Sequence, residues 1–358
     1  MTIQEKVPLA PLTTLQIGGL ARYFAEAKRE DEVRDAVQFA KSRDLPLFVF
    51  GGGSNLVIAD EGWPGLALKI AIGGITTSNT NDGKAVLFSV GAGVDWDDFV
   101  AQAVTQNCAG VECLSGIPGS VGGTPVQNVG AYGQEVSDTI ESVRALDSKD
   151  DRTVVLPKPA CGFRYRSSIF NTSERGRYVI LRVNYRLKRG GAPSLKYADL
   201  QKHFAGLCAE RTTPPSLAEV REAVREIRRS KGMLIVPGGN DCRSAGSFFK
   251  NPVLSELQFA DLAERAEAQG LEIPSYPALD ARRKVSAAWL VEHSGFGKGY
   301  TAGAVGISSK HALALVNRGE ARAEDIVRLK DAIQHAVKEA WGIALEPEPV
   351  FVGFKRTT

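Results

Sequence analysis

The chain has 358 residues, of which 43% are hydrophobic and 24% are charged, and its net charge at pH 7 is +3. These values are typical of a globular protein with two or three domains, each with its own core. They exclude a nucleic-acid-binding protein with a strongly basic surface, because the densest basic runs, 225–231 and 282–284, are short.

The N-terminal segment, the cysteines and the histidines argue against several further classes. Residues 1–14 lack the apolar region of a signal peptide, and no apolar run approaches the roughly 18 residues of a membrane span. We therefore expect a cytoplasmic protein with no membrane partner. The cysteines show no C-x-x-C spacing and the four histidines show no ligand spacing, which predicts free or buried thiols and no metal site. The cysteines are Cys108, Cys113, Cys161, Cys208 and Cys242.

Residues 1–72 are expected to form a small α/β lobe. Apolar residues between 33 and 40 recur with helical spacing, which predicts an amphipathic helix over 31–43 that Pro46 ends. Short apolar runs predict strands at 47–50, 56–59 and 66–70. The first of these strands leads into the glycine-rich segment 51–55.

Residues 73–212 are expected to form a second lobe that is rich in antiparallel strand. A strand over 86–94 precedes a helix, for which Asp95 has the position of an N-cap. The second glycine-rich segment, 115–133, follows this helix. Two apolar runs at 143–147 and 153–157 then predict a hairpin, and the alternation over 179–187 predicts a half-exposed strand.

Residues 213–343 are expected to form a third lobe, and 344–358 to close the chain as a strand. Ser216 and Glu219 have the spacing of a capping box at the start of a helix. A turn at 244–252 comes next. Apolar periodicity predicts helices that begin at Glu256, at Ala287 and near Glu324, with glycines that end the first and the last of them.

The two glycine-rich segments, GGGSN at 51–55 and SGIPGSVGGTPVQNVGAYG at 115–133, predict a cofactor site. Backbone without side chains can approach a phosphate or a flat ring closely, and successive N–H groups can converge on it. A turn-rich surface loop is the alternative for one such segment, but two segments edged by strands favour a cofactor. Leu56 replaces the third glycine of a dinucleotide fingerprint and no P-loop motif occurs, which excludes both common nucleotide sites.

Three polar stretches where glycine or proline distorts the backbone carry candidate catalytic groups. Ser247 lies in SAGSFFKNP, where a helix cap or a turn is the alternative role for its hydroxyl. In GFRYRSS, an extended backbone would place Arg164 and Arg166 on one side, where arginines usually form a solvated face. In LEPEP, Glu346 and Glu348 are stiffened by prolines, although glutamates there are normally exposed.

Motifs along nearly the whole chain together resemble one family, the UDP-N-acetylenolpyruvoylglucosamine reductases. They are GGGSNL, GIPGSVGGTPVQNVGAYG, YRSSIF, LKYADL, AGSFFKNP, HALALVN and LEPE. The resemblance implies an α+β fold in which two FAD-binding lobes of the vanillyl-alcohol-oxidase type are joined to a C-terminal substrate-binding domain. It also implies NADPH as electron donor and a reaction in peptidoglycan precursor synthesis.

By resemblance, the family reaction passes a hydride from NADPH to FAD and then to the methylene carbon of an enolpyruvyl ether. The resemblance makes Ser247 the general acid that protonates the neighbouring carbon. It makes Arg166 the group that holds the substrate carboxylate, and Glu348 the active-site carboxylic residue. Arg164 and Glu346 are the rivals for the last two roles.

The resemblance also assigns binding residues. Tyr197, Lys231 and Asn251 would contact the substrate, UDP-N-acetylglucosamine enolpyruvate. The residues expected around FAD are Gly51, Gly52, Gly53, Ser54, Asn55, Ser115, Gly116, Ile117, Pro118, Gly119, Gly122, Gly123, Asn128 and Gly130. We expect a monomer with a small-molecule substrate and no nucleic-acid partner.

Two other functions are weighed against the reductase. The first is an oxidase of the same flavin-binding fold that acts on a small alcohol or sugar. Such oxidases often attach the flavin covalently through histidine, whereas no histidine precedes His203 in this chain. The second is a non-catalytic flavin or nucleotide sensor, which would bind without turnover.

Overall fold

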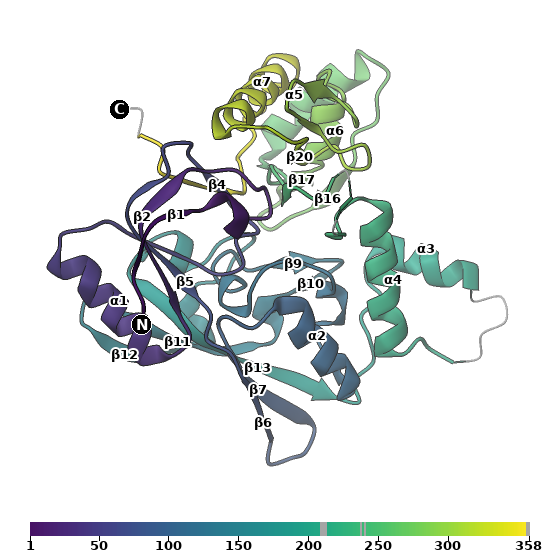
Figure 1. Cartoon of the computed structure of the whole chain (residues 1–358). Coiled ribbons are helices and arrows are strands. Elements are labelled where there is room, and N and C mark those ends of the chain that lie inside the picture. The colour runs from purple at the N-terminus through teal and green to yellow at the C-terminus, as the bar shows by residue number, and fades with distance from the viewer. Residues whose placement is uncertain (208–212, 237, 240, 356–358) are drawn as a thin grey trace. The chain divides into compact units, whose positions relative to one another are not determined.

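The computed structural model describes residues 1–207, 213–236, 238–239 and 241–355 (Figure 1). The chain divides into two compact units that alternate along the sequence. Unit 1 comprises Met1–Val7, Ala21–Gly53 and Trp63–Ser230, and unit 2 comprises Pro8–Leu20, Ser54–Gly62 and Lys231–Thr358. The helix with which we expected the third lobe to begin thus belongs to unit 1. The lobe boundaries at 72, 212 and 343 stay a prediction.

The first sheet of unit 1 has four strands and one covering helix. Its strand order is β1 (Gln4–Pro8), β2 (Leu20–Ala27), β5 (Trp63–Ile70) and β3 (Leu47–Phe50), and both β2 and β3 pair with β5 in parallel. Helix α1 (Glu30–Ser42) buries Val33, Ala36, Val37 and Ala40. The expected helix and the expected strands at 47–50 and 66–70 are confirmed, because their apolar residues face one core. The strand expected at 56–59 forms as well, but it belongs to unit 2 and not to this lobe.

The second sheet of unit 1 is antiparallel. Its main strand order is β12 (Arg152–Pro157), β11 (Ile140–Asp147), β13 (Tyr178–Arg189), β7 (Ala85–Gly91) and β6 (Ile75–Asn79), and β8 (Cys108–Ala109) also pairs with β13. The predicted hairpin and the predicted half-exposed strand are confirmed as β11, β12 and β13. Helix α2 (Trp96–Thr105) begins after Asp95, whose carboxylate accepts the N–H groups of Asp97 and Asp98, so the predicted cap is confirmed as well.

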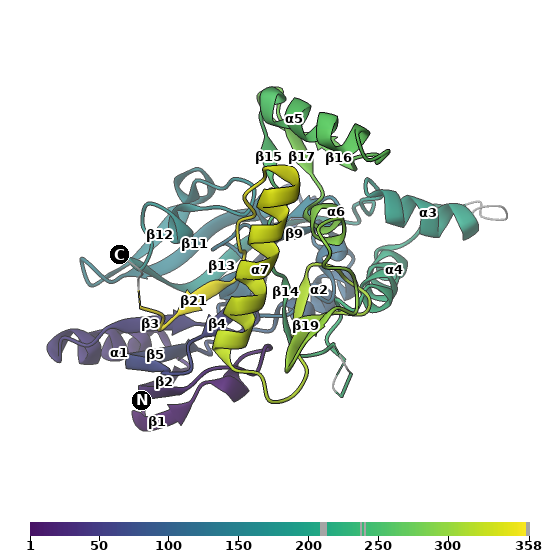
Figure 2. The same ribbon diagram turned by 90° about the horizontal axis from the view of Figure 1, so that it is seen from above.

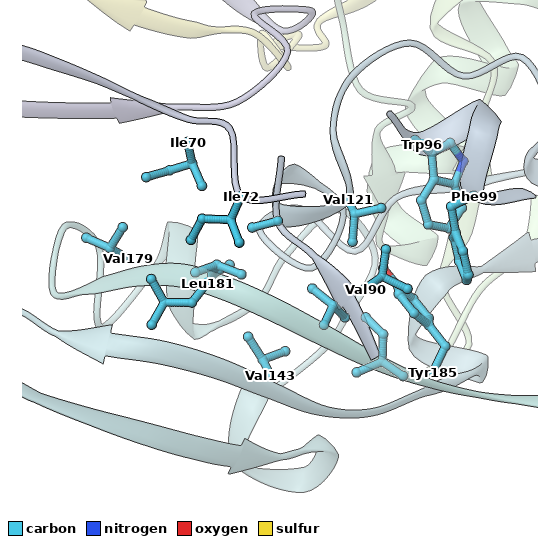
Figure 3. Packing of buried hydrophobic residues seen from close by; sticks show 14 of the residues in the cluster. Ile70, Ile72, Val90, Trp96, Phe99, Val121, Val143, Val179, Leu181 and Tyr185 are labelled. Atoms are coloured by element: carbon cyan, nitrogen blue, oxygen red, sulfur yellow. The ribbon is translucent and has the colours of Figure 1, made fainter. Parts of the chain in front are cut away.

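An aromatic group joins α2 to this sheet in the core of unit 1 (Figure 3). Trp96, Phe99 and Tyr185 are buried, and the ring centroids of Phe99 and Tyr185 lie 4.9 Å apart. The Tyr185 hydroxyl is satisfied by Thr124 Oγ1 at 2.8 Å. This packing fixes Thr124, and with it the middle of the glycine-rich segment 115–133, against the sheet.

Short elements and two helices complete unit 1. The short elements are the 3-10 turns Glu112–Leu114, Val121–Gly123, Val136–Asp138, Lys158–Cys161 and Ile169–Asn171, and the hairpin of β9 (Gly130–Ala131) and β10 (Gln134–Glu135). Helices α3 (Ala198–Leu207) and α4 (Leu217–Ser230) pack on each other and on Cys113 and Tyr132. The Ser216 hydroxyl accepts the N–H of Glu219, as the capping box predicts.

Unit 2 combines small sheets with three helices. The strands are β4 (Leu56–Ile58) with β21 (Val350–Val352), then β14 (Ser244–Ser247), β20 (Ala314–Asn317), β19 (Val305–Ile307) and β18 (Thr301–Ala302), and then β15 (Val253–Leu254), β17 (Arg283–Val285) and β16 (Ser275–Pro277). The helices are α5 (Glu256–Glu267), α6 (Ala287–Glu292) and α7 (Ala323–Trp341), with the 3-10 turn Ala10–Leu12 near the start of the chain. Figure 2 shows α7 running beside α6. Gly342 ends α7 in the left-handed conformation, as predicted.

The described cysteines carry no disulfide. Cys108, Cys113 and Cys161 are buried, Cys242 is partly exposed, and Cys208 lies outside the described residues. In the described part of the chain, no helix is both long and apolar enough to span a membrane. The same residues contain no cluster of three or more potential metal ligands.

Candidate active site

The two glycine-rich segments meet in unit 1. A Cβ atom on Gly51 would lie 1.9 Å from Ser120 Oγ, and one on Gly52 would lie 2.7 Å from the Cα of Gly119. Both distances are too short for any side chain. We name residues 51–53 and 115–123 the glycine cradle, because the fold places Gly51 against Ser120 and the backbone of Gly52 against that of Gly119.

The glycine cradle also contains a buried polar atom that suits a ligand. Ser120 Oγ is shielded from solvent and has no hydrogen-bond partner among the residues that the structure describes. A buried hydroxyl without a partner costs free energy, so such an atom normally has a ligand or a water to bind. Gly53, Gly116 and Gly119 have φ values of 66°, 70° and 123°, which a side chain would strain. These features fit a flat, phosphate-bearing cofactor such as FAD. Ser120 lies inside the glycine-rich motif but was not among the residues predicted to contact FAD.

Several N–H groups of the glycine cradle hold its own backbone in place. The N–H of Gly122 donates to Ala92 O at 2.8 Å, and that of Gly123 donates to Ser120 O at 2.9 Å. A Cβ atom on Gly122 would lie 2.6 Å from the Cβ of Ala92. Gly122 therefore allows the cradle to pack closely against Ala92, and its N–H donates to Ala92 O and not to a ligand.

A group of charged residues anchors Gly116. Its N–H donates to Asp97 Oδ1 at 2.6 Å, and its carbonyl accepts Arg228 Nε at 3.0 Å. Asp97 also accepts from Arg221 at 2.6 Å and from Arg225. Burial alone raises the pKa of the Asp97 carboxyl, but the hydrogen bonds from Arg221 and Gly116 and the charges of both arginines outweigh it, so this pKa lies below its ordinary value. No motif pointed to Asp97.

We predict that Asp97→Asn loosens the glycine cradle in a pH-dependent way. Because the pKa of Asp97 is lowered in the folded state, its carboxylate stabilises the fold above the ordinary Asp pKa of about 3.9, and this contribution is lost as the pH falls through the folded value. Urea unfolding should show a loss of about 1 to 3 kcal/mol at pH 7. The loss should shrink below pH 4. Asp98→Asn, at the exposed neighbouring residue, is the control. An equal loss of unfolding free energy in that variant would contradict the prediction.

We predict that Gly52→Ala impairs flavin binding, since its methyl group must displace the backbone of Gly119. Titration of the apoprotein with FAD should show an affinity at least about tenfold weaker, equivalent to about 1.4 kcal/mol. The matched control is Gly73→Ala, whose new Cβ atom would meet no atom within 4 Å. Wild-type affinity in Gly52→Ala would show that the cradle is not the flavin site.

Arg166 lies in a tight turn of unit 1. The N–H groups of Arg164 and Ser167 exchange hydrogen bonds with each other's carbonyls, and Arg166 between them has a φ of 52°. The extended backbone that we considered for this stretch is therefore wrong. The two arginines do not alternate along a strand; a turn sets their directions.

The structure separates Arg166 from its rival. Arg164 is exposed, whereas Arg166 is partly buried and donates from Nη2 to Gly130 O at 2.9 Å. Asn128, expected at the cofactor, is buried and bonds to Arg164 O at 3.1 Å and to Glu135 Oε2 at 2.8 Å. Asn128 thus supports the turn that presents Arg166, next to Gly130.

Ser247 lies at the end of β14 in unit 2. Its hydroxyl oxygen is 3.2 Å from Nε2 of His311. Phe248 and Phe249 follow it and are both fully buried, so this end of the strand is held rigidly. His311 is the first residue of the HALALVN motif, and the sequence alone predicted no role for it.

The LEPEP segment runs beside the Ser247 segment within unit 2. The N–H of Glu348 donates to Phe248 O at 2.9 Å, and that of Lys250 donates to Glu346 O at 3.0 Å. The Glu346 side chain is 70% exposed and forms an ion pair with Lys250, whereas Glu348 is partly buried. Burial therefore favours Glu348 over its rival.

The remaining expected residues have varied environments. Asn251 accepts the N–H of Ala287 at 2.9 Å and so supports the start of α6. The ring of Tyr197, which is 40% exposed, stands edge-on to Tyr132 at 5.2 Å. Asn55 donates from Nδ2 to the Glu348 carbonyl at 3.2 Å within unit 2. Lys231 is partly exposed at the start of the long C-terminal part of unit 2.

Comparisons with known proteins match the glycine cradle and the Ser247 segment to two different domain families. The model of an FAD binding domain matches residues 21–156, which include the whole glycine cradle. The model of the C-terminal domain of UDP-N-acetylenolpyruvoylglucosamine reductase matches residues 238–352, which include Ser247 and Glu348. The expected fold, FAD-binding α+β with a C-terminal domain, is confirmed, and the chain is an FAD-containing oxidoreductase.

Relatives cover nearly the whole chain. The UDP-N-acetylenolpyruvoylglucosamine reductase of Thermobifida fusca is 46% identical over 98% of this chain and 98% of its own length. That of Streptomyces avermitilis is 47% identical over 97% of this chain and 94% of its own. A solved structure of UDP-N-acetylenolpyruvylglucosamine reductase from Thermus caldophilus superposes with a TM-score of 0.66 at 25% identity, covering 98% of this chain and 100% of that one. The chain belongs to the UDP-N-acetylenolpyruvoylglucosamine reductase family.

Proposed function

We propose that this chain reduces UDP-N-acetylglucosamine enolpyruvate to UDP-N-acetylmuramate, with NADPH as the hydride donor, in peptidoglycan precursor synthesis. The observation that carries the proposal is the 46% identity, over 98% of the chain, to a protein named for this reductase activity. The position of Ser247, at the rigid end of β14 beside the partly buried Glu348 segment, supports it. We propose that the enzyme works as a cytoplasmic monomer without nucleic-acid or membrane partners.

FAD, held by the glycine cradle with Ser120 Oγ as one polar contact, would supply the transfer of a hydride from NADPH to the methylene carbon of the enolpyruvyl group. The double bond then opens, and its electron pair moves to the neighbouring carbon and into the carboxylate. That carbon is a strong base, so Ser247 Oγ–H can protonate it although a hydroxyl is a weak acid. One hydride and one proton are thereby added across the carbon–carbon bond, and the serine recovers its proton from solvent.

We assign the two charged residues to the substrate carboxylate. Arg166 offers a planar fork of N–H donors, which suits a carboxylate whose negative charge grows during the reaction. Its contact with Gly130 O fixes the orientation of this fork. Glu348 would hydrogen-bond the same carboxyl group, acting as an acid or orienting it. Tyr197, Lys231 and Asn251 are proposed to bind the rest of the sugar nucleotide, Asn251 in addition to its contact with α6.

An anaerobic absorbance experiment tests the proposal. Purified protein should be yellow, lose its colour when NADPH is added, and regain it when the enolpyruvyl substrate follows. Recovery of colour only after oxygen is admitted would reject the reductase and favour the oxidase. Release of all flavin on denaturation would separately exclude the covalent attachment that is frequent in such oxidases. If the protein binds flavin but no electron donor bleaches it, the non-catalytic sensor would be the remaining hypothesis.

A further inference from the structure

The backbone of His311 is held in place by the turn that precedes β20. Its own N–H donates to Ser308 Oγ at 3.3 Å, and its carbonyl accepts the N–H of Ala314 at 3.1 Å. Ser247 pairs with Ala314 in the sheet, and Phe248 N–H donates to Leu313 O at 2.8 Å. Ser247 and the turn that carries His311 are therefore held next to each other by the pairing of β14 with β20.

The hydrogen bonds determine which ring nitrogen of His311 carries the proton. The backbone N–H of Leu313 points at Nδ1 at 3.2 Å, so Nδ1 accepts this hydrogen bond with its lone pair and carries no proton. In a neutral imidazole the proton is then on Nε2. Nε2 lies 3.2 Å from Ser247 Oγ, so the imidazole donates and the serine oxygen accepts.

Because His311 donates to Ser247 Oγ, the direction of the serine O–H is restricted. A hydroxyl has one hydrogen and two lone pairs, and its hydrogen rotates to suit its surroundings. With one lone pair directed at His311 Nε2–H, the Ser247 hydrogen cannot point at the ring and is available to another acceptor. After the proton has left, the same N–H donates to the serine oxyanion, and charge-assisted hydrogen bonds are the stronger kind.

We propose that His311 is the positioning residue for Ser247: it turns the hydroxyl hydrogen toward the substrate carbon and stabilises the oxyanion that remains. This inference rests on the proposed function, because it assumes that Ser247 is the proton donor. His311 itself donates no proton to the substrate. Its effect should therefore be confined to the step in which Ser247 acts.

Two substitutions separate this role from a merely structural one. His311→Asn keeps an acceptor close to the Leu313 N–H, but its amide is too short to reach Ser247. His311→Gln is long enough to place an N–H donor near the position of Nε2. If the histidine only supports the turn, the Asn variant should behave like the wild type.

Anaerobic stopped-flow absorbance measures both half-reactions in the FAD-loaded enzyme. We expect bleaching by NADPH at the wild-type rate in both variants. Recovery of colour with the enolpyruvyl substrate should be roughly 10- to 100-fold slower in His311→Asn, as for the loss of one hydrogen bond to a developing charge. In His311→Gln it should be within about fivefold of the wild type, because the amide restores an N–H donor to Ser247 Oγ. In steady state, kcat should fall while KM changes little.

A double-mutant cycle gives the decisive readout. In a Ser247→Ala background, His311→Asn should slow the reaction no further, because its effect acts through the serine. An additive effect would overturn the inference, as would wild-type rates in His311→Asn or an equal loss in the Asn and Gln variants. If the wild-type enzyme itself does not regain colour with the substrate, the proposed function fails instead.

Discussion

Ser247→Ala is expected to lower the turnover number by about 10²- to 10⁴-fold, the usual contribution of a positioned proton donor. The loss arises because the carbon next to the carboxylate must take its proton from less well-placed water. Bleaching of the flavin by NADPH should keep its wild-type rate, since the hydroxyl takes no part in that step. Stopped-flow absorbance with each substrate in turn measures the two steps separately.

A control on the same strand distinguishes chemistry from folding. Ser244 also lies on β14, and its hydroxyl makes only a long contact of 3.4 Å with the Gly246 N–H among the hydrogen bonds described for its side chain. Ser244→Ala should turn over normally. Normal turnover in Ser247→Ala would remove Ser247 from the mechanism. A loss of flavin bleaching in that variant would show that the substitution disturbs more than the protonation.

Arg166→Lys is expected to reduce kcat by about 10²- to 10³-fold, the usual cost of losing one donor aimed at a developing negative charge. Lysine keeps the positive charge but has no planar fork, so it cannot both contact Gly130 O and present paired donors. Steady-state kinetics with varied enolpyruvyl substrate measures the effect. The loss should be in kcat/KM as well as in kcat.

The neighbouring arginine supplies the matched comparison. Arg164 is exposed, and its backbone forms the turn through its N–H and carbonyl groups, which Arg164→Gln leaves in place. This variant should keep near-normal kinetics. If Arg164→Gln were the slower of the two, the assignment of the carboxylate-binding role would pass to Arg164.

Local patterns predicted the helices and strands well, because their signals lie within a few residues. Asp95 caps α2 and Gly342 ends α7 as their positions in the sequence suggest. The contact between Gly52 and Gly119 joins residues that are far apart in the chain. Composition suggested that two glycine segments serve one cofactor, but only the folded structure shows that they touch.

Other features of the site depend on tertiary structure that no short pattern encodes. The positive φ of Arg166 follows from a turn supported by Asn128, which reaches Arg164 O from a different segment. In the sequence, Asp97 resembles any acidic residue in the first turn of a helix. In the structure it accepts hydrogen bonds from the Gly116 N–H, Arg221 and Arg225, and Arg228 donates to the Gly116 carbonyl. Resemblance identified Ser247, whereas only the distance to Nε2 identifies His311 as its partner.

The parallel pairing of β4 with β21 joins two strands that are far apart in the sequence. Leu56 pairs with Val350, so β4 gains its partner only after the long stretch of chain between these two residues has been synthesised. Contacts of such long sequence separation carry a large loop-closure cost and form slowly. Until then the edge of residues 56–58 is open to other extended chains. We therefore expect β4 and β21 to pair late in the folding of unit 2.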